Sequence, residues 1–246
     1  MATREKTPAP RTESAETAPL AQSSDKEVAE FLDRVKSVGP RQSETGRGRL
    51  LFAMDATMSR QATWDMALDL QADMFRAVKA IGGLDVQLCY FRGFGECRFS
   101  KWVSDPDTLA GLMTKVYCRA GCTQISKVLS HTKRENQAAG IDALVYVGDC
   151  MEEEVDYLAA VAGELGILSV PVFLFQEGRD ANAEKAFKEI ARLTRGAHCR
   201  FDQGSAKQLR ELLTAVAVYA AGGKRALEDL SSASGGSART LLEQMS

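Results

Sequence analysis

Apolar residues in this chain alternate between short strand-like runs and longer stretches in which they recur at helical spacing. The strand-like runs lie at 49–54, 85–91, 96–103, 143–147, 168–175 and 198–201. The stretches with helical spacing lie at 61–81, 106–118, 124–136, 152–165, 182–195 and 206–219. Strands separated by helices predict a doubly wound α/β domain, whose sheet is mostly parallel and carries helices on both faces.

One pair of strands is predicted to form a hairpin. The segments DVQLCYF and ECRFSKWV flank Gly93-Phe94-Gly95, a short connection rich in glycine. We therefore expect one antiparallel strand at an edge of the sheet.

The chain divides into four parts by composition. Residues 1–25 are poor in large apolar side chains, which predicts a disordered tail. Residues 26–48 contain a short amphipathic helix, stopped by Gly39-Pro40, and a linker. The α/β domain is predicted to span 49–221. Residues 222–246 include SSASGGS and a short helical stretch, ARTLLEQM, and predict a flexible C-terminal tail.

Charge and composition narrow the classes of function. With 31 basic and 33 acidic residues, the net charge of −2 provides no field that would gather nucleic acid, so no direct nucleic-acid contact is expected. The N-terminal segment lacks the apolar core of a secretory signal, and no segment has the roughly 18 apolar residues of a membrane span. We therefore expect a cytoplasmic protein without a membrane segment. Its six cysteines form no CxxC pair, which favours free thiols.

Three polar clusters fall at predicted strand ends or in loops at the same edge of the sheet. Asp55, Thr57 and Ser59 follow the first strand, Thr123 precedes a predicted helix, and Asp149 follows the run ALVYV. In sheets of this kind, ligands bind at the carboxyl ends of the strands. Two carboxylates and three hydroxyls suit a hard cation, so we expect Mg²⁺, with Mn²⁺ close behind.

These residues resemble the metal-ion-dependent adhesion site of the von Willebrand factor type A (VWA) family. The family's site is written DxSxS, followed by a distant Thr and a distant Asp. This chain has DATMS, then the Thr of GCTQ, then the Asp of VGDC, in matching order and spacing. Thr57 stands where the family usually has Ser, so the hydroxyl is kept. The resemblance covers residues 49–221 and points to a bacterial-type intracellular member with the Rossmann-like VWA fold.

The resemblance implies a role for each of the five residues. Thr57 and Ser59 would bind the metal through their hydroxyls, and Asp55 and Asp149 would act largely through bound waters. Thr123 would join directly or through water. In the family, a partner's carboxylate often completes the coordination sphere. The implied partner is therefore a protein that offers an Asp or Glu side chain.

Helix capping is the more ordinary interpretation of a single hydroxyl residue before a helix, and it applies to Thr57 and Ser59. The acidic run that follows Met151 likewise has two interpretations. It would extend an acidic rim around the metal, or it would complement the dipole of a first helical turn. Five matching positions spread from Asp55 to Asp149 favour the metal site over capping alone.

A thiolate site is a further alternative. Cys122 and Cys150 lie beside Thr123 and Asp149, and Cys118 precedes Cys122 by about one helical turn. Zinc sites usually have tighter paired spacing, and a cysteine nucleophile would need a base. Only two histidines are present to supply that base: we expect His198, which opens a predicted strand, to be structural, and His131, in a charged helix, to be solvated.

The leading hypothesis is a divalent-cation-dependent protein-binding module, an adaptor without catalytic residues. A Mg²⁺-type ion at the strand ends would bridge to an acidic residue of the partner. Intracellular members of the family commonly serve in multiprotein assemblies, so the resemblance implies an ATPase-containing assembly as a partner.

Two other functions stay open from the sequence. A metal-assisted phosphohydrolase on a related α/β sheet would use Asp55 as nucleophile, but the carboxylate expected two residues later is Thr57, and no phosphate-binding glycine loop is present. An RNA-protein assembly factor is the other alternative, because some VWA domains occur in such particles. The near-neutral charge argues against direct RNA contact in that case.

Overall fold

The structure is a computed structural model that describes residues 46–201, 205–234 and 236–245. The strands are β1 (Gly48–Asp55), β2 (Leu84–Arg92), β3 (Glu96–Val103), β4 (Ala143–Gly148), β5 (Val172–Glu177) and β6 (Ala197–Phe201). The helices are the short η1 (Met58–Arg60), α2 (Gln61–Val78), α3 (Pro106–Met113), α4 (Ile125–Ala139), α5 (Val155–Ile167), α6 (Ala181–Thr194), α7 (Ala206–Ser234) and α8 (Ser237–Gln244). Of the helices in these ranges, none has both the length and the apolar content needed to cross a lipid bilayer. The predictions for residues 1–45 lie outside the described residues.

The six strands form one sheet in the order β3-β2-β1-β4-β5-β6. Neighbouring strands are parallel throughout, except that β2 and β3 pair antiparallel as a hairpin. The predicted doubly wound α/β fold is confirmed, and so is the antiparallel strand at the edge. The chain reverses its direction of winding between β1 and β4, and the carboxyl ends of these two neighbours form the crevice in which such sheets bind ligands.

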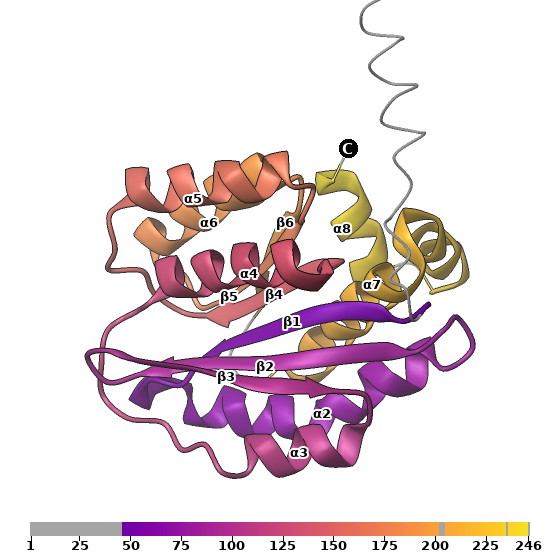
Figure 1. Cartoon of the computed structure of the whole chain (residues 1–246), viewed down its shortest axis with the longest axis horizontal. Helices are drawn as coiled ribbons and strands as arrows, with labels where there is room; N and C mark the ends of the chain where they lie inside the picture. Colours follow the sequence, from indigo (N-terminus) through magenta and orange to yellow (C-terminus); the bar gives the residue numbers. More distant parts are fainter. Residues whose placement is uncertain (1–45, 202–204, 235, 246) are drawn as a thin grey trace, which may run out of the picture. The chain divides into compact units, whose positions relative to one another are not determined.

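Helices cover both faces of the sheet, as Figure 1 shows. Leu50 and Phe52 of β1 face a core that they share with α2, α3, α7 and α8. Leu51 and Ala53, the alternate residues, face a second core shared with α4, α5 and α6. Because both faces of the sheet are buried, the sequences of the central strands are continuous apolar runs and do not alternate between apolar and polar residues.

Strand β5 and helix α3 differ from their predicted ranges. The strand predicted at 168–175 begins only at Val172, because Pro171 has no N–H to donate and Ser169 has a positive φ of 57°. The helix predicted at 106–118 ends at Met113, whose carbonyl accepts a hydrogen bond from the Trp64 indole (3.1 Å). The chain then runs without regular structure to α4, and this irregular segment carries Thr123.

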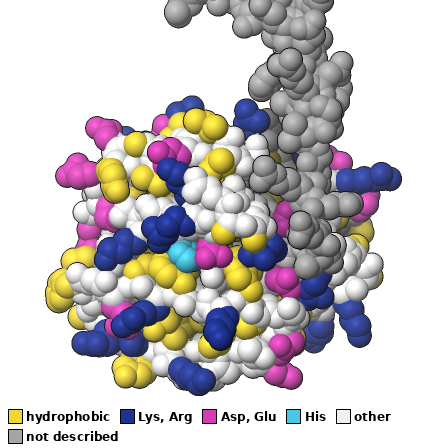
Figure 2. All heavy atoms as spheres, viewed as in Figure 1, with side chains coloured by type: hydrophobic (Ala, Val, Ile, Leu, Met, Phe, Trp, Pro, Cys, Tyr) yellow, Lys and Arg dark blue, Asp and Glu magenta, His cyan; other side chains and the backbone are white. Residues whose placement is uncertain are grey.

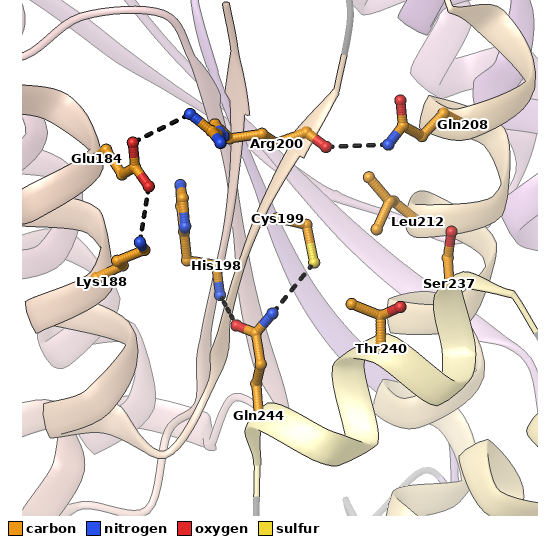
Figure 3. Close-up of a pocket in the computed structure, with 10 residues that line it drawn as sticks. All are labelled: Glu184, Lys188, His198, Cys199, Arg200, Gln208, Leu212, Ser237, Thr240 and Gln244. Carbon is orange, nitrogen blue, oxygen red and sulfur yellow. Dashed lines mark hydrogen bonds and ion pairs between the residues drawn. The ribbon is translucent and has the colours of Figure 1, made fainter. Parts of the chain in front are cut away.

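The C-terminal segment differs from the predicted flexible tail in its described residues. Helix α7 continues to Ser234 through one non-helical residue, Gly223 (φ 69°, ψ −166°), a conformation that glycine adopts without steric cost. Helix α8 then packs on the core through Ala238 and Leu241. The side chain of Gln244 accepts a hydrogen bond from His198 N of β6 (2.7 Å; Figure 3). Helix α8 thus covers part of β6, the strand at this edge of the sheet, and protects it from pairing with another chain.

The Leu241→Ala variant is expected to lose about 2 to 5 kcal/mol of unfolding free energy, because truncating a fully buried leucine leaves a cavity. Urea unfolding followed by circular dichroism measures this loss. Arg239→Ala, on the exposed face of the same helix, is the matched control and should change stability by less than about 0.5 kcal/mol. Equal stability of Leu241→Ala and wild type would show that α8 is not docked in solution.

Candidate functional site

The predicted site residues lie in the segments that follow β1, precede α4 and follow β4. Strands β1 and β4 are neighbours, and their register pairs Met54 with Val147, so the residues after both strands leave the sheet side by side. The loop after β1 is held by its backbone. Ala56 N donates to Phe91 O (2.9 Å), and Arg119 N, from the segment before α4, donates to Ala56 O (3.0 Å). All three segments therefore meet at the carboxyl edge of the sheet.

Asp55, the last residue of β1, has a buried carboxylate whose two oxygens differ in their contacts. Its Oδ1 accepts a hydrogen bond from Thr57 N (2.7 Å). Its Oδ2 is buried with no hydrogen-bond partner among the described residues. Burial raises the pKa of Asp55 to about 6 against the opposing hydrogen bonds from Thr57, and the Asp149 carboxylate adds to the rise. An ionised carboxylate that is buried in this way destabilises the fold unless a cation or a water molecule interacts with its Oδ2.

Ser59 connects the loop after β1 to Asp149. Ser59 Oγ donates to Asp149 Oδ2 (2.8 Å) and lies 3.5 Å from Thr57 Oγ1. Asp149 Oδ1 is the second carboxylate oxygen of this edge that is buried without a partner in the described part of the chain. An oxygen of Asp55, an oxygen of Asp149 and the sulfur of Cys150 all lie within 4.8 Å of one another. The structure therefore brings four of the five predicted residues together.

Thr123, the fifth predicted residue, bonds to the segment after β4 and not to Asp55 or Ser59. Its Oγ1 accepts a hydrogen bond from Glu152 N (3.1 Å), and its own N–H donates to the Glu152 carboxylate (3.0 Å). Glu153 accepts from Ser126 N (3.0 Å) and from Ile125 N, so it caps the start of α4. The acidic run thus interacts with the N-terminal end of α4 and positions Thr123 at the same edge.

The capping interpretation finds little support in these contacts. Thr57 precedes η1, but its side chain makes no capping hydrogen bond to the described residues. Ser59 donates to a carboxylate instead of accepting from a backbone N–H. The residue before α4 is Gln124, which also makes no side-chain cap within the described ranges. The hydroxyls of Thr57 and Ser59 are therefore available for another role.

Arg60 is a site residue that the sequence analysis missed. Its side chain is only 3% exposed, and it forms ion pairs with Asp149 (Nη1 to Oδ2, 3.3 Å) and with Glu177 at the end of β5. Thr63 forms hydrogen bonds with both Arg60 and Glu177. Burial raises the pKa of Asp149, but the Arg60 charge and the hydrogen bond from Ser59 hold it below its ordinary value. The signal that would have revealed Glu177 is its place at the end of the apolar run FLFQE, at the same edge as Asp55.

The thiolate alternative is not supported by the surroundings of the cysteines. Burial and the neighbouring Asp149 carboxylate raise the pKa of the Cys150 thiol far above its ordinary value, so it stays protonated. His198, the candidate base, shares a hydrogen bond with Gln176 Oε1 (2.9 Å), and burial lowers its pKa to about 4. His131 shares one with Gln87 Oε1 (2.8 Å) on the far side of the sheet from α2. His198 is structural, as expected, whereas the expectation that His131 is solvated was wrong, because His131 is buried and stacks on Phe99.

The donor set fits a hard divalent cation. The carboxylates of Asp55, Asp149 and Glu177 face one guanidinium, that of Arg60, which leaves two formal negative charges among largely buried groups. Two carboxylate oxygens have no partner within the described residues, and neither has the buried hydroxyl of Tyr146. Carboxylate and hydroxyl oxygens are the ligands that Mg²⁺ and Mn²⁺ prefer, whereas soft metals prefer thiolates.

Comparison with known proteins identifies the fold of this chain but not its function. No family model matches the chain, and no curated protein sequence matches it. Solved structures do match. The SpRpn10 VWA domain is 12% identical with a TM-score of 0.52, over 72% of this chain and 97% of that domain.

Two other solved structures also match most of this chain at low sequence identity. An aerotolerance-related membrane protein from Bacteroides fragilis is 16% identical with a TM-score of 0.53, over 68% of this chain and 96% of that one. A von Willebrand factor type A protein from Catenulispora acidiphila is 14% identical with a TM-score of 0.55, over 68% of this chain and 42% of that one. This chain thus spans less than half of the latter protein. At such identities the similarity establishes a VWA-like fold and nothing finer.

Proposed function

We propose that this chain is a divalent-cation-dependent protein-binding module with a metal-ion-dependent adhesion site. The observation that carries the proposal is the pair of buried carboxylate oxygens, Asp55 Oδ2 and Asp149 Oδ1, that lack partners in the described chain at the carboxyl edge of the sheet. Hydroxyl groups of Thr57 and Ser59 stand beside them. An arrangement of oxygens with uncompensated negative charge favours a bound Mg²⁺ or Mn²⁺ ion.

Each predicted residue would contribute through the contacts described above. Asp55 and Asp149 would supply the negative charge, while Thr57 and Ser59 would supply neutral oxygens. Thr123, fixed by Glu152, would complete the set from the opposite segment. When bound, the ion supplies a positive centre that attracts a carboxylate, because few of its protein ligands are anionic.

The proposed partner is a protein that presents an Asp or Glu side chain to this edge, within a cytoplasmic multiprotein assembly that includes an ATPase. This part of the proposal rests on the resemblance to intracellular VWA proteins. We propose no catalytic role. The phosphohydrolase alternative needs a second carboxylate two residues after Asp55, and Thr57 offers a hydroxyl there.

Calorimetric titration of Mg²⁺ and of Mn²⁺ into the chelator-treated protein tests the proposal. We expect saturable binding of one ion per chain, and loss of binding in Asp149→Asn. Asp156→Asn, an exposed acidic residue of α5, is the matched control and should bind as the wild type does. Absence of saturable binding to the wild type would contradict the proposal.

The partner is tested by affinity capture on the immobilised protein. Proteins that bind through the ion should be retained in Mg²⁺, released by chelator, and absent from a column of the Asp149→Asn variant. Capture that is the same with and without Mg²⁺ would show that binding does not use the ion.

A further inference from the structure

The β2–β3 hairpin places two cysteines on the face of the sheet that α4 covers. Cys97 pairs with Phe91 and Cys89 pairs with Phe99, so the two cysteines occupy diagonal positions on adjacent strands. Cys89 is fully buried in the core beneath α4, and Cys97 packs against the same core while remaining half-buried. The Cys89 thiol is close enough to Cys97 for the two to affect each other's pKa. Cys97 therefore has a buried thiol beside it and partial access to solvent.

A pocket of about 220 Å³ opens beside Cys97. Its lining combines cationic and hydroxyl groups of α4 with aromatic rings and glycine backbone: Gly95, Phe99, Ser126, Lys127, Ser130, Arg134 and Tyr157. Within the described chain, the lining contains no carboxylate. In the view of Figure 2, dark blue Lys and Arg side chains gather over α4. The pocket thus suits an anion with an apolar body.

The Glu153 carboxylate raises the pKa of Cys97, but it is already engaged by the N–H groups of Ile125 and Ser126 at the start of α4. The adjacent Cys89 thiol lowers the pKa of Cys97, and the charges of Lys127 and Arg134 lower it further against the effect of burial. A thiol in such surroundings carries a larger thiolate fraction than a free cysteine at neutral pH.

We propose that Cys97 is a reactive thiol and that the pocket beside it receives a small disulfide that bears carboxylates. The Cys97 thiolate attacks one sulfur of this disulfide and forms a new S–S bond. The disulfide's own S–S bond breaks, and its other half leaves as a thiolate; an alkyl thiolate then takes up a proton from water, whereas an acidic aromatic one stays ionised. Lys127 and Arg134 hold the carboxylates, and Phe99 supports the apolar part. The reaction needs no other oxidant, and it is independent of the ion site.

Cys122 provides the competing expectation. It is the exposed cysteine of the chain, so accessibility alone predicts that it reacts first. Desolvation and the adjacent Glu152 carboxylate, however, raise the pKa of Cys122. The remaining four cysteines have thiol pKa values raised by burial: Cys89, Cys118, Cys150 and Cys199. The electrostatic surroundings therefore predict that Cys97 reacts first, whereas solvent accessibility predicts that Cys122 reacts first.

The test is the rate of reaction of the full chain with dithiobis(nitrobenzoate), an aromatic disulfide with two carboxylates, followed by absorbance of the released thiolate. At about neutral pH we expect one thiol to react at least ~10-fold faster than the others. The fast phase should vanish in Cys97→Ser and persist in Cys122→Ser. Mass spectrometry of peptides from the partly reacted protein should place the first adduct on Cys97.

Pocket variants separate this proposal from simple exposure. Arg134→Gln and Lys127→Gln should each slow the fast phase several-fold with the dianionic reagent and leave the rate with neutral hydroxyethyl disulfide less affected. A fast phase that persists in Cys97→Ser, or a first adduct on Cys122, would overturn the proposal. Equal effects of the pocket variants on both reagents would overturn the assignment of the pocket as the carboxylate-binding element.

Discussion

In the presence of chelator, the Asp55→Asn variant is expected to be more stable than the wild type by about 1 to 3 kcal/mol near pH 8. Asp55 has a pKa of about 6 in the folded chain, against an ordinary value of 3.8. The folded state therefore binds more protons than the unfolded state between these two values. Unfolding free energy falls as pH rises through this window, and the loss persists above it. Asparagine does not titrate, and its side-chain oxygen still accepts from Thr57 N.

The ion should reverse this order of stability. At an Mg²⁺ concentration about 100-fold above the dissociation constant, the wild type should gain about 2.7 kcal/mol, because the ion binds the folded state only. The Asp55→Asn variant lacks the charge that holds the ion, so it should gain little. Urea unfolding at several pH values, with chelator and with Mg²⁺, measures both effects.

Asp142→Asn is the matched control for this prediction. Burial raises the pKa of Asp142 to about 6 as well, and its carboxylate accepts from Arg49 N (2.7 Å). Asp142 precedes β4 and Asp149 follows it, however, so the two residues lie at opposite ends of this strand. This variant should be stabilised in chelator and keep the full response to Mg²⁺. If both variants kept that response, Asp55 would not be part of an ion site.

The Arg60→Met variant is expected to lose about 3 to 5 kcal/mol of unfolding free energy. Arg60 and Glu177 have side chains only 3% and 4% exposed, so removal of the guanidinium leaves a buried carboxylate without its counter-charge. Asp149 loses an ion pair at the same time. Urea unfolding in chelator measures the loss.

The double variant Arg60→Met, Glu177→Gln should recover much of that stability, because the uncompensated charge is removed while the volume is nearly kept. Glu177→Gln alone leaves Arg60 with Asp149 and should cost less than Arg60→Met. The coupling energy of this double-mutant cycle should be large. A coupling near zero would show that Arg60 and Glu177 are not paired in solution.

The sequence by itself determined the architecture and most of the edge chemistry. Strands buried on both faces and amphipathic helices carry their signal in local periodicity, so RLLFAM and ALVYV identify β1 and β4 without knowledge of their neighbours. The parallel sheet then requires that residues after these strands meet at one edge, which is why Asp55 and Asp149 could be predicted to converge. Thr57 and Ser59 follow because they belong to the same short loop as Asp55.

The docking of α8 was not predictable from local pattern. The stretch ARTLLEQM is short and is preceded by SSASGGS, so local propensity indicates a flexible end. Burial of Leu241 and the hydrogen bond that His198 N of β6 donates to Gln244 stabilise the helix, and both depend on residues that are distant in the chain.

Only the tertiary structure decided which charges and thiols face one another. Arg60 ends the short helix η1 and Glu177 ends strand β5, and the local sequence of neither segment indicates that the two residues pair. Thr123 was predicted at the edge, but its bonds to Glu152 became known only from the fold. Cys89 and Cys97 became neighbours through the register of one hairpin. The hydrophobic pattern of a helix or strand depends on residues that are close in sequence, so it can be identified from the sequence. Ion pairing and hydrogen bonding depend on distances in space, which only the folded structure defines.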